Sequence, residues 1–532
     1  MQVAGEHDRI RPGQSEHRLE QGLQLRLGSH RQQGLLSSPA LTGTSERGAY
    51  DEVAYPGYVY AHTHPARLEA LGRLFGLAPP PAATCRVLEL GCGDGANSLA
   101  IAQTLPGAHV VGIDASPTAI ERGQALARAA GLTNVELRGG DLMDLAVADD
   151  PEPADYVIAH GVYSWIPPAV RGALLESCRR RLTAHGIAFV SYNAYPGSYL
   201  RDMTRDILAF HLQGVSAPSE RIARAHQLME TIVAVESPSP YARVLREHLQ
   251  RMLGASEALL YHDDLAPIST PFYFHEFMEH ATAHELQFLS EADLSDSQLR
   301  DVPPSVGELI ESLPNDVIAR EQYLDFFTNR MFRRTLLIHS KVDLRRAIDD
   351  RHVEGLVVSS PARPDGPEGR FVTPDGVEMS SADPLVVAMM GDLSDRWPSS
   401  VSFEDLLASA WRRISAEPLP AGVAEPVRGV LLEAYLAHIV ELGAVTTPVA
   451  ARASQRPLAS PLARAQSASG LRVLSTLLPG NYAPETPLVH RALAVLDGTR
   501  DRETLARELE EAPEAIDDVL NQLAAQALLV RD

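Results

Sequence analysis

The chain has 532 residues, of which 45% are hydrophobic and 22% charged; this is typical of globular proteins, and the length predicts about three or four domains of roughly 150 residues each. A formal net charge of −22 argues against general affinity for nucleic acid or anionic membranes. Three cysteines are too few for a disulfide framework, and no His/Cys cluster has zinc-site spacing, so we expect a protein without a metal. No apolar segment resembles a signal peptide or a membrane span, so we expect a cytoplasmic location.

The amino-terminal segment predicts a disordered extension followed by an ordered arm. Residues 1–47 are rich in Gln, Arg, Gly, Ser and His and show little apolar periodicity. Tyr50 and Tyr55 follow in an arm that we expect to close over a bound cofactor as a lid. Thr63 is the expected N-cap of the first helix, whose apolar residues lie on one face.

Strand and helix patterns alternate over residues 86–194. The expected strands read RVLEL, HVVGID, VELRGG, ADYVIA and IAFVSYN, and the segments NSLAIAQTL, PTAIERGQALARAAG and PPAVRGALLESCRRRL between them are helical in pattern. This alternation predicts an α/β fold, a doubly wound parallel sheet with right-handed crossovers. We expect the core domain to span residues 48–200.

The rest of the chain predicts a helical insertion, a return to the sheet and two terminal modules. Residues 201–285 are helical in pattern and are expected over the carboxyl edge of the sheet, which two strands within residues 286–345 then complete. Beyond them we expect mainly helical, winged-helix-like modules at 350–445 and 483–532, separated by a linker at 446–482. In so acidic a chain these modules predict protein contacts and no binding of nucleic acid.

A glycine-rich loop follows the first expected strand in VLELGCGDGAN. Gly91, Gly93 and Gly95 allow a turn with positive φ and a close approach of a ligand to the backbone. The same letters fit the dinucleotide pattern G-x-G-x-x-G/A, so a nicotinamide dinucleotide and a purely structural use of the glycines are alternatives.

Acidic residues at the ends of three successive strands favour a different ligand. Glu89 directly precedes the glycine loop, where a carboxylate suits a ligand ammonium group better than a pyrophosphate. Asp114 ends the second strand, where it can accept both ribose hydroxyls, and Asp141 follows the third strand beside the expected adenine pocket. The combination predicts S-adenosylmethionine (SAM), a cationic nucleoside amino acid. The expected cofactor residues are Glu89, Gly91, Gly93, Gly95, Asp114, Ala115, Asp141, Leu142 and His160.

Six segments of the chain resemble a known family. VLELGCGDGAN, GIDASPTAIERG, VIAHGVYSWIPPAVRGALL, FVSYNAYPGSYLRDM, YFHEFMEHATAH and FRRTLLIHSKV are similar to bacterial SAM-dependent methyltransferases with a methyltransferase regulatory domain, whose best-known members are rickettsial protein-lysine methyltransferases that act on outer-membrane proteins. The resemblance is close over residues 48–345 and loose beyond them. It implies a class I (Rossmann-like) core, a helical middle domain and winged-helix-like terminal modules. It also implies that Gly91, Gly93, Asp114 and Asp141 belong to the SAM site and that a protein lysine is a candidate acceptor.

The acceptor is expected at the tips of the fourth and fifth strands, HGVYSWIPP and SYNAYPGSYL, because SAM occupies the first three tips. Methyl transfer is an in-line displacement that needs an aligned, deprotonated acceptor, and aromatic faces attract a sulfonium or ammonium group. The expected catalytic residues are His160, Tyr163, Trp165, Tyr192 and Asn193. In this interpretation His160 either accepts a proton or only forms hydrogen bonds, and each aromatic ring has core packing as its alternative.

Other aromatic and histidine residues near these segments have structural interpretations. Tyr195 and Tyr199 are expected to anchor their loop into the helical insertion. His275 and His280 lie five residues apart, so they do not share a helical face as a pair of metal ligands would.

Three functions are compatible with these patterns. The first is SAM-dependent N-methylation of a protein side chain, with lysine preferred, because about half of the chain is not needed for a small acceptor. The second is methylation of a small metabolite, with the extra domains serving oligomerisation, and a homodimer is one assembly to test. The third is a non-catalytic SAM-binding scaffold. All three predict no nucleic-acid partner and no membrane insertion.

Overall fold

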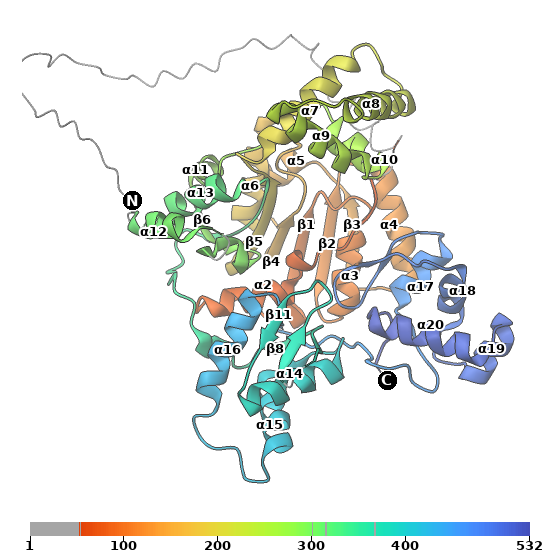
Figure 1. Ribbon diagram of the computed structural model, residues 1–532. Helices are drawn as coiled ribbons and strands as arrows, with labels where there is room; N and C mark the ends of the chain where they lie inside the picture. Colours follow the sequence, from red (N-terminus) through yellow and green to blue (C-terminus); the bar gives the residue numbers. More distant parts are fainter. Residues whose placement is uncertain are drawn as a thin grey trace, which may run out of the picture. The chain divides into compact units, whose positions relative to one another are not determined.

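The computed structural model describes residue 53 and residues 55–149, 151–299, 302–313, 316–366 and 369–531 (Figure 1). The predicted disordered extension at 1–47 and Tyr50 of the predicted lid lie outside these described residues. Among the helices in the described part of the chain, none is long and apolar enough to cross a membrane.

A seven-stranded sheet lies at the centre of the core domain, in the order β3-β2-β1-β4-β5-β7-β6 (Figure 1). Its strands are β1 (Arg86–Leu90), β2 (His109–Asp114), β3 (Val135–Gly139), β4 (Ala154–Ala159), β5 (Leu182–Asn193), β6 (Leu286–Glu291) and β7 (Phe332–His339). The first five strands pair in parallel, and β7 is antiparallel to β5 and β6. The predicted α/β fold is confirmed, including the two strands that return to complete the sheet. The strand order reverses between β1 and β4, so ligands are expected at the carboxyl ends of these strands.

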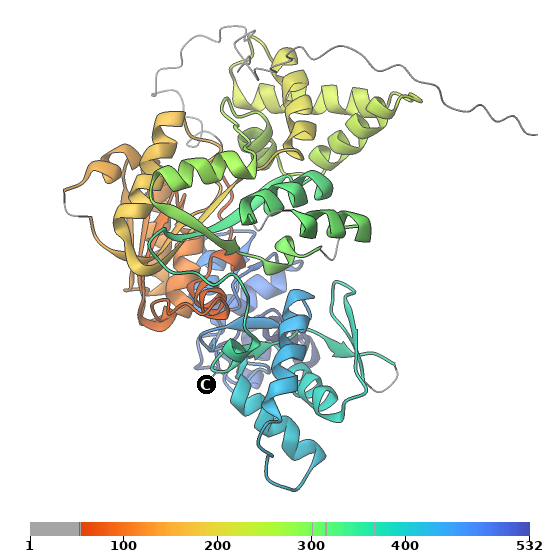
Figure 2. The same ribbon diagram turned by 90° about the vertical axis from the view of Figure 1, so that its left-hand side faces the viewer.

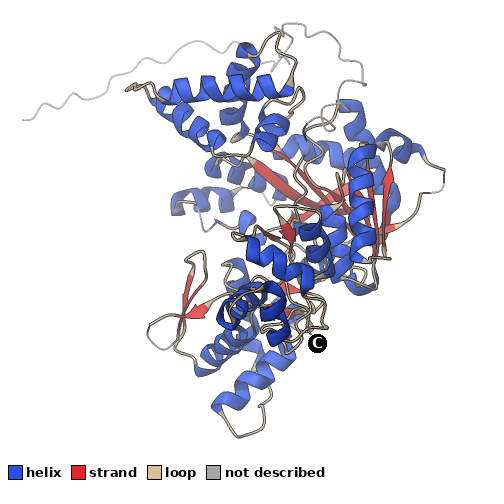
Figure 3. Cartoon of the chain, turned by 90° about the vertical axis from the view of Figure 1, so that its right-hand side faces the viewer, coloured by secondary structure: helices blue, strands red, loops and turns tan. Residues whose placement is uncertain are grey.

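Helices cover both faces of the sheet, as Figure 3 shows for the red strands between blue helices. They are α2 (Pro65–Leu74), α3 (Ala96–Thr104), α4 (Pro117–Ala130), α5 (Leu142–Val147) and α6 (Pro168–Arg181). Proline opens several of them, because its fixed φ and missing N–H suit the first turn of a helix. The second proline of WIPP is such a residue, since Pro168 is the first residue of α6.

The N-cap of α2 is His64. The prediction of Thr63 as this N-cap is wrong. The His64 Nδ1 accepts a hydrogen bond from the backbone N–H of Ala66 at 3.3 Å. The Thr63 hydroxyl instead donates to the carbonyl of Tyr60 at 2.8 Å. An imidazole lone pair can satisfy a free amide of the first turn as a hydroxyl does, and Pro65 follows as the first helical residue.

The alternation of side chains along β5 divides the predicted site between two cores. Phe189 packs with Leu71 and Ile158 on one face of the sheet. Tyr192 packs with Phe277 on the other face. Because successive residues of a strand point to opposite faces, Ser191 and Asn193 share the face of Phe189 and not that of Tyr192.

The helical insertion contacts the segment that follows β4 at the carboxyl edge of the sheet. It contains α7 (Ser198–His211), α8 (Pro218–Val233), α9 (Pro240–Leu253), α10 (Glu257–Leu259), η3 (Leu260–Asp264) and α11 (Phe274–Ala283). The olive and yellow-green helices in Figures 1 and 2 are α7 to α9, which have an apolar cluster of their own. The Arg201 guanidinium lies 5.7 Å from the ring centre of Trp165, and the N–H of Thr270 donates to the carbonyl of Ser164 at 2.8 Å.

Two helices follow β6, and a buried charge cluster holds the second of them on β6 and β7. These helices are α12 (Pro304–Ser312) and α13 (Val317–Thr328). Arg333 is fully buried, and its guanidinium donates to Glu291 at 2.7 Å, to both oxygens of Asp325 at 2.8 Å and to Glu321 at 3.1 Å. A buried charge is stable only when it is paired, so this cluster fixes the start of β7 and with it the neighbouring residues Phe332 and Arg334.

The first carboxyl-terminal module shares a hydrophobic core with the sheet. It contains β8 (Val357–Ser359), β9 (Arg363–Pro364), β10 (Arg370–Val372), β11 (Glu378–Ser380), α14 (Pro384–Arg396), β12 (Val401–Ser402), α15 (Phe403–Ile414), α16 (Ala424–Leu436) and β13 (Glu441–Gly443). Leu356, Leu406 and Leu431 belong to the same cluster as Leu71 and Phe189. The module is therefore continuous with one face of the core domain.

The second module begins earlier than predicted, and the linker prediction for residues 446–482 is wrong in part. The module contains α17 (Pro461–Ala468), β14 (Leu474–Ser475), β15 (Asn481–Tyr482), α18 (Pro487–Val495), α19 (Arg502–Leu509) and α20 (Pro513–Ala525). The linker was predicted from the scarcity of bulky residues, but α17 packs closely against α4 and α3 through its small side chains and Leu462 (Figure 1). The winged-helix character of both modules stays a prediction.

Candidate functional site

The glycine loop between β1 and α3 leaves an open space at the carboxyl edge of the sheet. Gly91, Gly93 and Gly95 have φ values of +71°, +58° and +75°, which other residues rarely adopt. A Cβ on Gly91 would lie 2.5 Å from a methyl carbon of Val162, so the loop passes directly beneath the segment that follows β4. A Cβ on Gly93 would meet no atom within 4 Å. The backbone at Gly93 is therefore accessible to a ligand.

Asp114 at the end of β2 holds this loop in place. Its Oδ2 accepts a hydrogen bond from the N–H of Gly93, and its Oδ1 accepts one from the N–H of Ser116, both at 2.8 Å. A carboxylate has about four acceptor positions, so each oxygen retains one for a ligand hydroxyl. Ala115 is exposed beside it.

Asp141 lies next to Asp114 across the sheet. The N–H of Gly140 donates to the Asp114 carbonyl at 2.9 Å. The Asp141 carboxylate caps α5 by accepting from the N–H of Met143 at 2.9 Å, and Leu142 is partly buried at the start of that helix. The structure thus brings together the three strand ends from which the SAM site was predicted, and the open backbone at Gly93 fits such a ligand.

Glu89 lies behind the glycine loop, with both carboxylate oxygens engaged. The Asn97 Nδ2 donates to Oε1 at 2.9 Å, and the Ser98 hydroxyl donates to Oε2. The side chain is only 4% exposed, and burial raises the pKa of Glu89 to about 7. These contacts join β1 to α3, and direct contact between Glu89 and a ligand ammonium stays a prediction.

The raised pKa of Glu89 predicts a pH-dependent effect of Glu89→Gln on the stability of the ligand-free protein. Between the ordinary pKa of about 4.5 and the folded-state value of about 7, the folded protein binds a proton that the unfolded chain has lost. The wild type therefore loses stability as pH rises through this window, and the neutral glutamine does not. We expect the variant's advantage in free energy of unfolding to grow from pH 4.5 to pH 7 and then level off, on the order of 3 kcal/mol.

Denaturant titrations at a series of pH values measure this difference. Glu121→Gln, which removes an exposed carboxylate from α4, is the matched control and should show no such pH dependence. An advantage of Glu89→Gln that stays constant from pH 4.5 to pH 8 would contradict the burial argument.

A strap formed by residues 55–64 crosses over the tips of β1 and β4. The N–H of Tyr60 donates to the Asn97 Oδ1 at 3.0 Å, and the Asn97 amide also donates to the Thr63 hydroxyl at 3.0 Å. The ring of Tyr60 lies against His160, with 3.9 Å between ring centres. Sequence reasoning selected Tyr55 of this arm but missed Tyr60 and Asn97, because their contacts join distant parts of the chain.

The strap and His160 line a cavity of about 830 Å³ at this edge. Further walls come from Phe189 in β5, from Phe332 and Arg334 in β7, from parts of residues 295–298 and 327–330, and from residues 479–480. Because Val162 contacts the glycine loop, the His160 wall of the cavity adjoins the predicted cofactor site.

His160 is held in a neutral state at the wall of this cavity. Its Nδ1 lies 2.9 Å from the Ser191 hydroxyl, which leaves Nε2 as its other ring nitrogen for a ligand. Burial, together with the charge of Arg334, lowers the pKa of His160 to about 4. His62 also lines the cavity; its buried Nδ1 has no hydrogen-bond partner among the described residues, and burial lowers its pKa to about 3.

Tyr163 and Tyr192 do not line this cavity, so its walls give no support to their predicted contact with the acceptor. Tyr163 is 0% exposed and Tyr192 is 1% exposed. The Tyr163 hydroxyl lies 2.9 Å from the His280 Nδ1, and the Tyr192 ring stacks on Phe277 with 4.1 Å between centres. Both rings belong to the core on the opposite face of the sheet, so packing is what they contribute.

Tyr163→Phe is therefore expected to leave kcat and SAM affinity within about twofold of the wild type, and to cost about 1 kcal/mol of stability through the lost hydrogen bond to His280. Methyl-transfer kinetics and thermal unfolding measure the two effects. A tenfold loss of kcat in a variant that still binds SAM would show that Tyr163 contributes to methyl transfer.

Trp165 and Asn193 lie at the carboxyl edge in different environments. Trp165 is partly buried under Arg201 of the insertion, where its ring contributes to packing. Asn193 is 4% exposed, and its Nδ2 has no hydrogen-bond partner among the described residues. Because Asn193 shares the strand face of Ser191, this free donor keeps it a candidate for contact with the acceptor.

The remaining predicted residues have structural contacts. Tyr195 stacks on Tyr199 with 4.3 Å between ring centres. The His275 Nδ1 lies 2.9 Å from the Gln322 side chain, and Tyr55 lies edge-on to His262 of the insertion. In the described part of the chain, no group of His, Cys, Asp and Glu could hold a metal ion.

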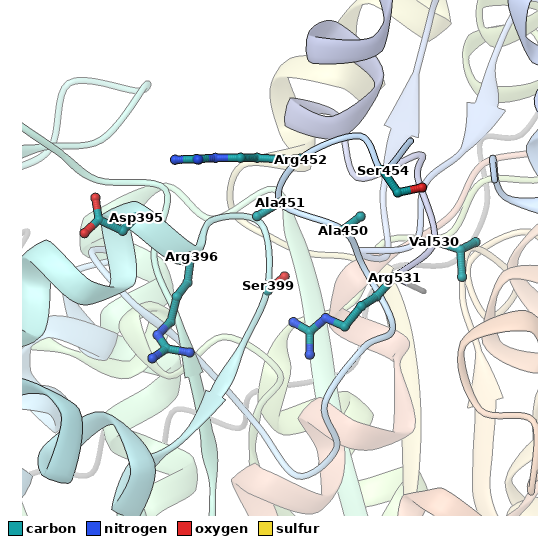
Figure 4. A pocket seen from close by; sticks show the side chains of 9 residues that line it. All are labelled: Asp395, Arg396, Ser399, Ala450, Ala451, Arg452, Ser454, Val530 and Arg531. Atoms are coloured by element: carbon teal, nitrogen blue, oxygen red, sulfur yellow. The ribbon is translucent and has the colours of Figure 1, made fainter. Parts of the chain in front are cut away.

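A smaller hollow of about 370 Å³ lies between the two carboxyl-terminal modules (Figure 4). Arg396 of α14 enters it from one side, and Arg531 from the other, with Arg452 above them in the view. None of the predicted site residues lines this hollow, so it has no part in the site described above.

Comparisons with known proteins identify two family regions in the chain. The model of a family described as a methyltransferase domain matches residues 87–186, which include the glycine loop. A second family, described as a predicted methyltransferase regulatory domain, matches residues 256–339, which include α11 to β7.

Relatives with similar sequences occur in Rickettsia prowazekii. One uncharacterised protein is 34% identical over 385 residues, which cover 69% of each chain. A second uncharacterised protein is 35% identical over 243 residues, which cover 45% of this chain and 96% of the relative.

A solved structure of PKMT2 from Rickettsia typhi has a similar fold over most of the chain. It is 25% identical with a TM-score of 0.78, and the likeness covers 90% of this chain and 100% of PKMT2. PKMT2 has also been solved in complex with AdoHcy, the product that a SAM-dependent methyltransferase releases.

Proposed function

Since the chain belongs to the SAM-dependent methyltransferases with a methyltransferase regulatory domain, we propose that it N-methylates a protein side chain, with lysine as the preferred acceptor. The family makes SAM the cofactor and methyl transfer the activity, so a non-catalytic scaffold no longer explains the chain. The acceptor, the cytoplasmic location and a homodimer remain predictions.

The SAM site in this proposal is the carboxyl edge of β1, β2 and β3. Asp114 binds the ribose hydroxyls through its remaining acceptor positions and keeps Gly93 in place. Asp141 and Leu142 border the adenine. When bound, SAM supplies an electrophilic methyl group on a sulfonium, and the protein's task is to orient a deprotonated acceptor toward it.

The cavity beside His160 is the acceptor site in this proposal, and its charges favour a neutral amine. Arg334 faces the cavity, and its charge contributes to the lowered pKa values of His62 and His160. The same charge lowers the pKa of a lysine amine bound there, which supplies the free lone pair that methyl transfer needs. Asp296 accepts a hydrogen bond from Arg334 at 2.9 Å and moderates this effect.

His160 orients the acceptor in this account. When Nδ1–H donates to Ser191, Nε2 bears the lone pair and can accept a hydrogen bond from an amine N–H. The aromatic rings of Tyr60, Phe189 and Phe332 exclude water from the path of the methyl group and attract the cationic product.

The proposal of a protein acceptor rests on the walls of the cavity. Some of these walls come from regions of the chain that methyl transfer itself does not require. Ser295 and Asp296 come from the regulatory region, and Pro479 and Gly480 come from the second carboxyl-terminal module. An acceptor that touches both regions is expected to be a chain segment that enters between them.

Methylation of a small metabolite is the second candidate. It is favoured by the cavity volume of about 830 Å³, which falls within the range typical of small-molecule pockets. In that case the regulatory and terminal regions would close the cavity around the metabolite.

Incubation of the full chain with methyl-labelled SAM and a bacterial extract, separated into proteins and small molecules, distinguishes the two candidates. We expect label in the protein fraction, and label confined to the small molecules would contradict the proposal. Lys341 is the only lysine of the chain, so Lys341→Arg removes automethylation of a lysine side chain from the assay.

A further inference from the structure

We propose that the second carboxyl-terminal module is part of the acceptor site and that Asn481 is a positioning residue, which holds the strap over His160. The inference rests on the acceptor cavity proposed above. It extends that function by assigning a role in acceptor binding to a module far from the catalytic domain in sequence.

Asn481 clamps the strap through both functional groups of its side chain. The N–H of Val59 donates to the Asn481 Oδ1 at 2.9 Å, and the Asn481 Nδ2 donates to the carbonyl of Val59 at 2.8 Å. The two residues are 422 positions apart. This reciprocal pair satisfies both polar groups of one strap residue, as a neighbouring strand would.

The clamp is next to the residues that form the cavity. Tyr60 follows Val59 directly, and its N–H is fixed by Asn97 while its ring lies against His160. Pro479 and Gly480 immediately precede Asn481 and line the same cavity. The strap is therefore held from two sides, by the module at Val59 and by α3 at Tyr60.

The module that presents Asn481 is itself fixed on the catalytic domain. β14 and β15 pair with each other, and the N–H of Thr476 donates to the carbonyl of Gly480 at 3.1 Å across the turn between them. The Gln103 side chain of α3 accepts from the Ser460 hydroxyl at 2.7 Å and from the N–H of Leu462 at 2.9 Å. A clamp built on such a frame restricts where the strap can lie.

The module is also joined to the strap by apolar contacts. Leu462 and Ala465 of α17 belong to the same buried cluster as Val59 of the strap and Leu99 of α3. Loss of Asn481 therefore should not release the module, because these contacts remain. Loss of Asn481 removes the restraint on the backbone of Val59. Tyr60 and His62 then lose their fixed positions in the cavity.

Asn481→Ala is expected to lower kcat/KM for the protein acceptor by about 10- to 100-fold, since small displacements of positioning groups cost this much. The Kd for SAM should stay within about twofold of the wild type, because no hydrogen bond among the described residues joins β14 or β15 to the glycine loop, Asp114 or Asp141. Hydrogen exchange of residues 55–64 should become faster. Asn481→Asp keeps the acceptor for the Val59 N–H but loses the donor, so we expect an intermediate loss.

Asn521→Ala is the matched control, an exposed asparagine of α20 in the same module. It should leave kcat/KM, SAM affinity and hydrogen exchange unchanged. Retained SAM affinity reports that each variant is folded; if Asn481→Ala does not fold, Asn481→Asp decides the question. Wild-type kcat/KM with unchanged exchange in residues 55–64 would overturn the inference. Failure of the proposed function would give a different result, because the wild type itself would then label no protein.

Discussion

Asp114→Ala is expected to weaken SAM binding by about 10- to 100-fold, because hydrogen bonds to a charged group contribute about 1.5–3 kcal/mol. The substitution removes the acceptor for the N–H groups of Gly93 and Ser116 as well as the proposed acceptor for the ribose hydroxyls. It therefore loosens the glycine loop and deletes a ligand contact at once. Isothermal titration calorimetry with SAM and with S-adenosylhomocysteine measures the loss.

Two comparisons make the Asp114 result specific. Asp114→Asn retains one side-chain oxygen as an acceptor, and we expect a smaller loss of affinity than for alanine. Asp343→Ala, which removes an exposed aspartate beyond the end of β7, should bind SAM as the wild type does. Unchanged affinity of Asp114→Ala would remove Asp114 from the SAM site.

His160→Ala is expected to lower kcat by about 100-fold, because loss of the group that orients the acceptor misplaces its lone pair, with little change in SAM affinity. The substitution removes the ring nitrogen that orients the amine and the surface against which Tyr60 packs. Because the pKa of His160 is lowered to about 4, its protonation should not limit the rate near neutral pH. The rate should instead rise with pH as the acceptor amine loses its proton.

His185→Ala is the control for this variant, because His185 is an exposed histidine near the amino end of β5, in the same strand as Ser191. It should retain wild-type kcat and pH dependence. A rate of His160→Ala close to that of the wild type would mean that His160 serves only to hold Ser191 and the turn after β4.

The fold and the proximity of the residues proposed to bind SAM could be predicted because their signals are local in the sequence. Each strand carries its own apolar run, and the residues proposed to bind SAM follow consecutive strands. Gly93, Asp114 and Asp141 therefore come together in any parallel sheet with this order. The contacts confirm that proximity through the Gly93–Asp114 and Gly140–Asp114 hydrogen bonds.

The sequence could not resolve which residues face the proposed acceptor cavity, because the end of a strand does not reveal which face its side chains take. His160 and Tyr163 are three residues apart, yet one lines the cavity and the other lies in the core on the opposite face of the sheet. Tyr60 and Asn481 could not be found from the sequence at all. Their roles depend on contacts between the strap, α3 and a hairpin 422 positions further along the chain, for which no local pattern exists.

The identity of the methylated amino acid is the sharpest test of a lysine acceptor. Labelled proteins from the reaction with methyl-labelled SAM are hydrolysed, and the labelled amino acid is identified by chromatography and mass spectrometry. Transfer to an amine in the His160 cavity predicts label in methylated lysine, which the wild type produces and His160→Ala produces at a strongly reduced rate. Label recovered only in another amino acid, or only in metabolites of low molecular weight, would contradict the account.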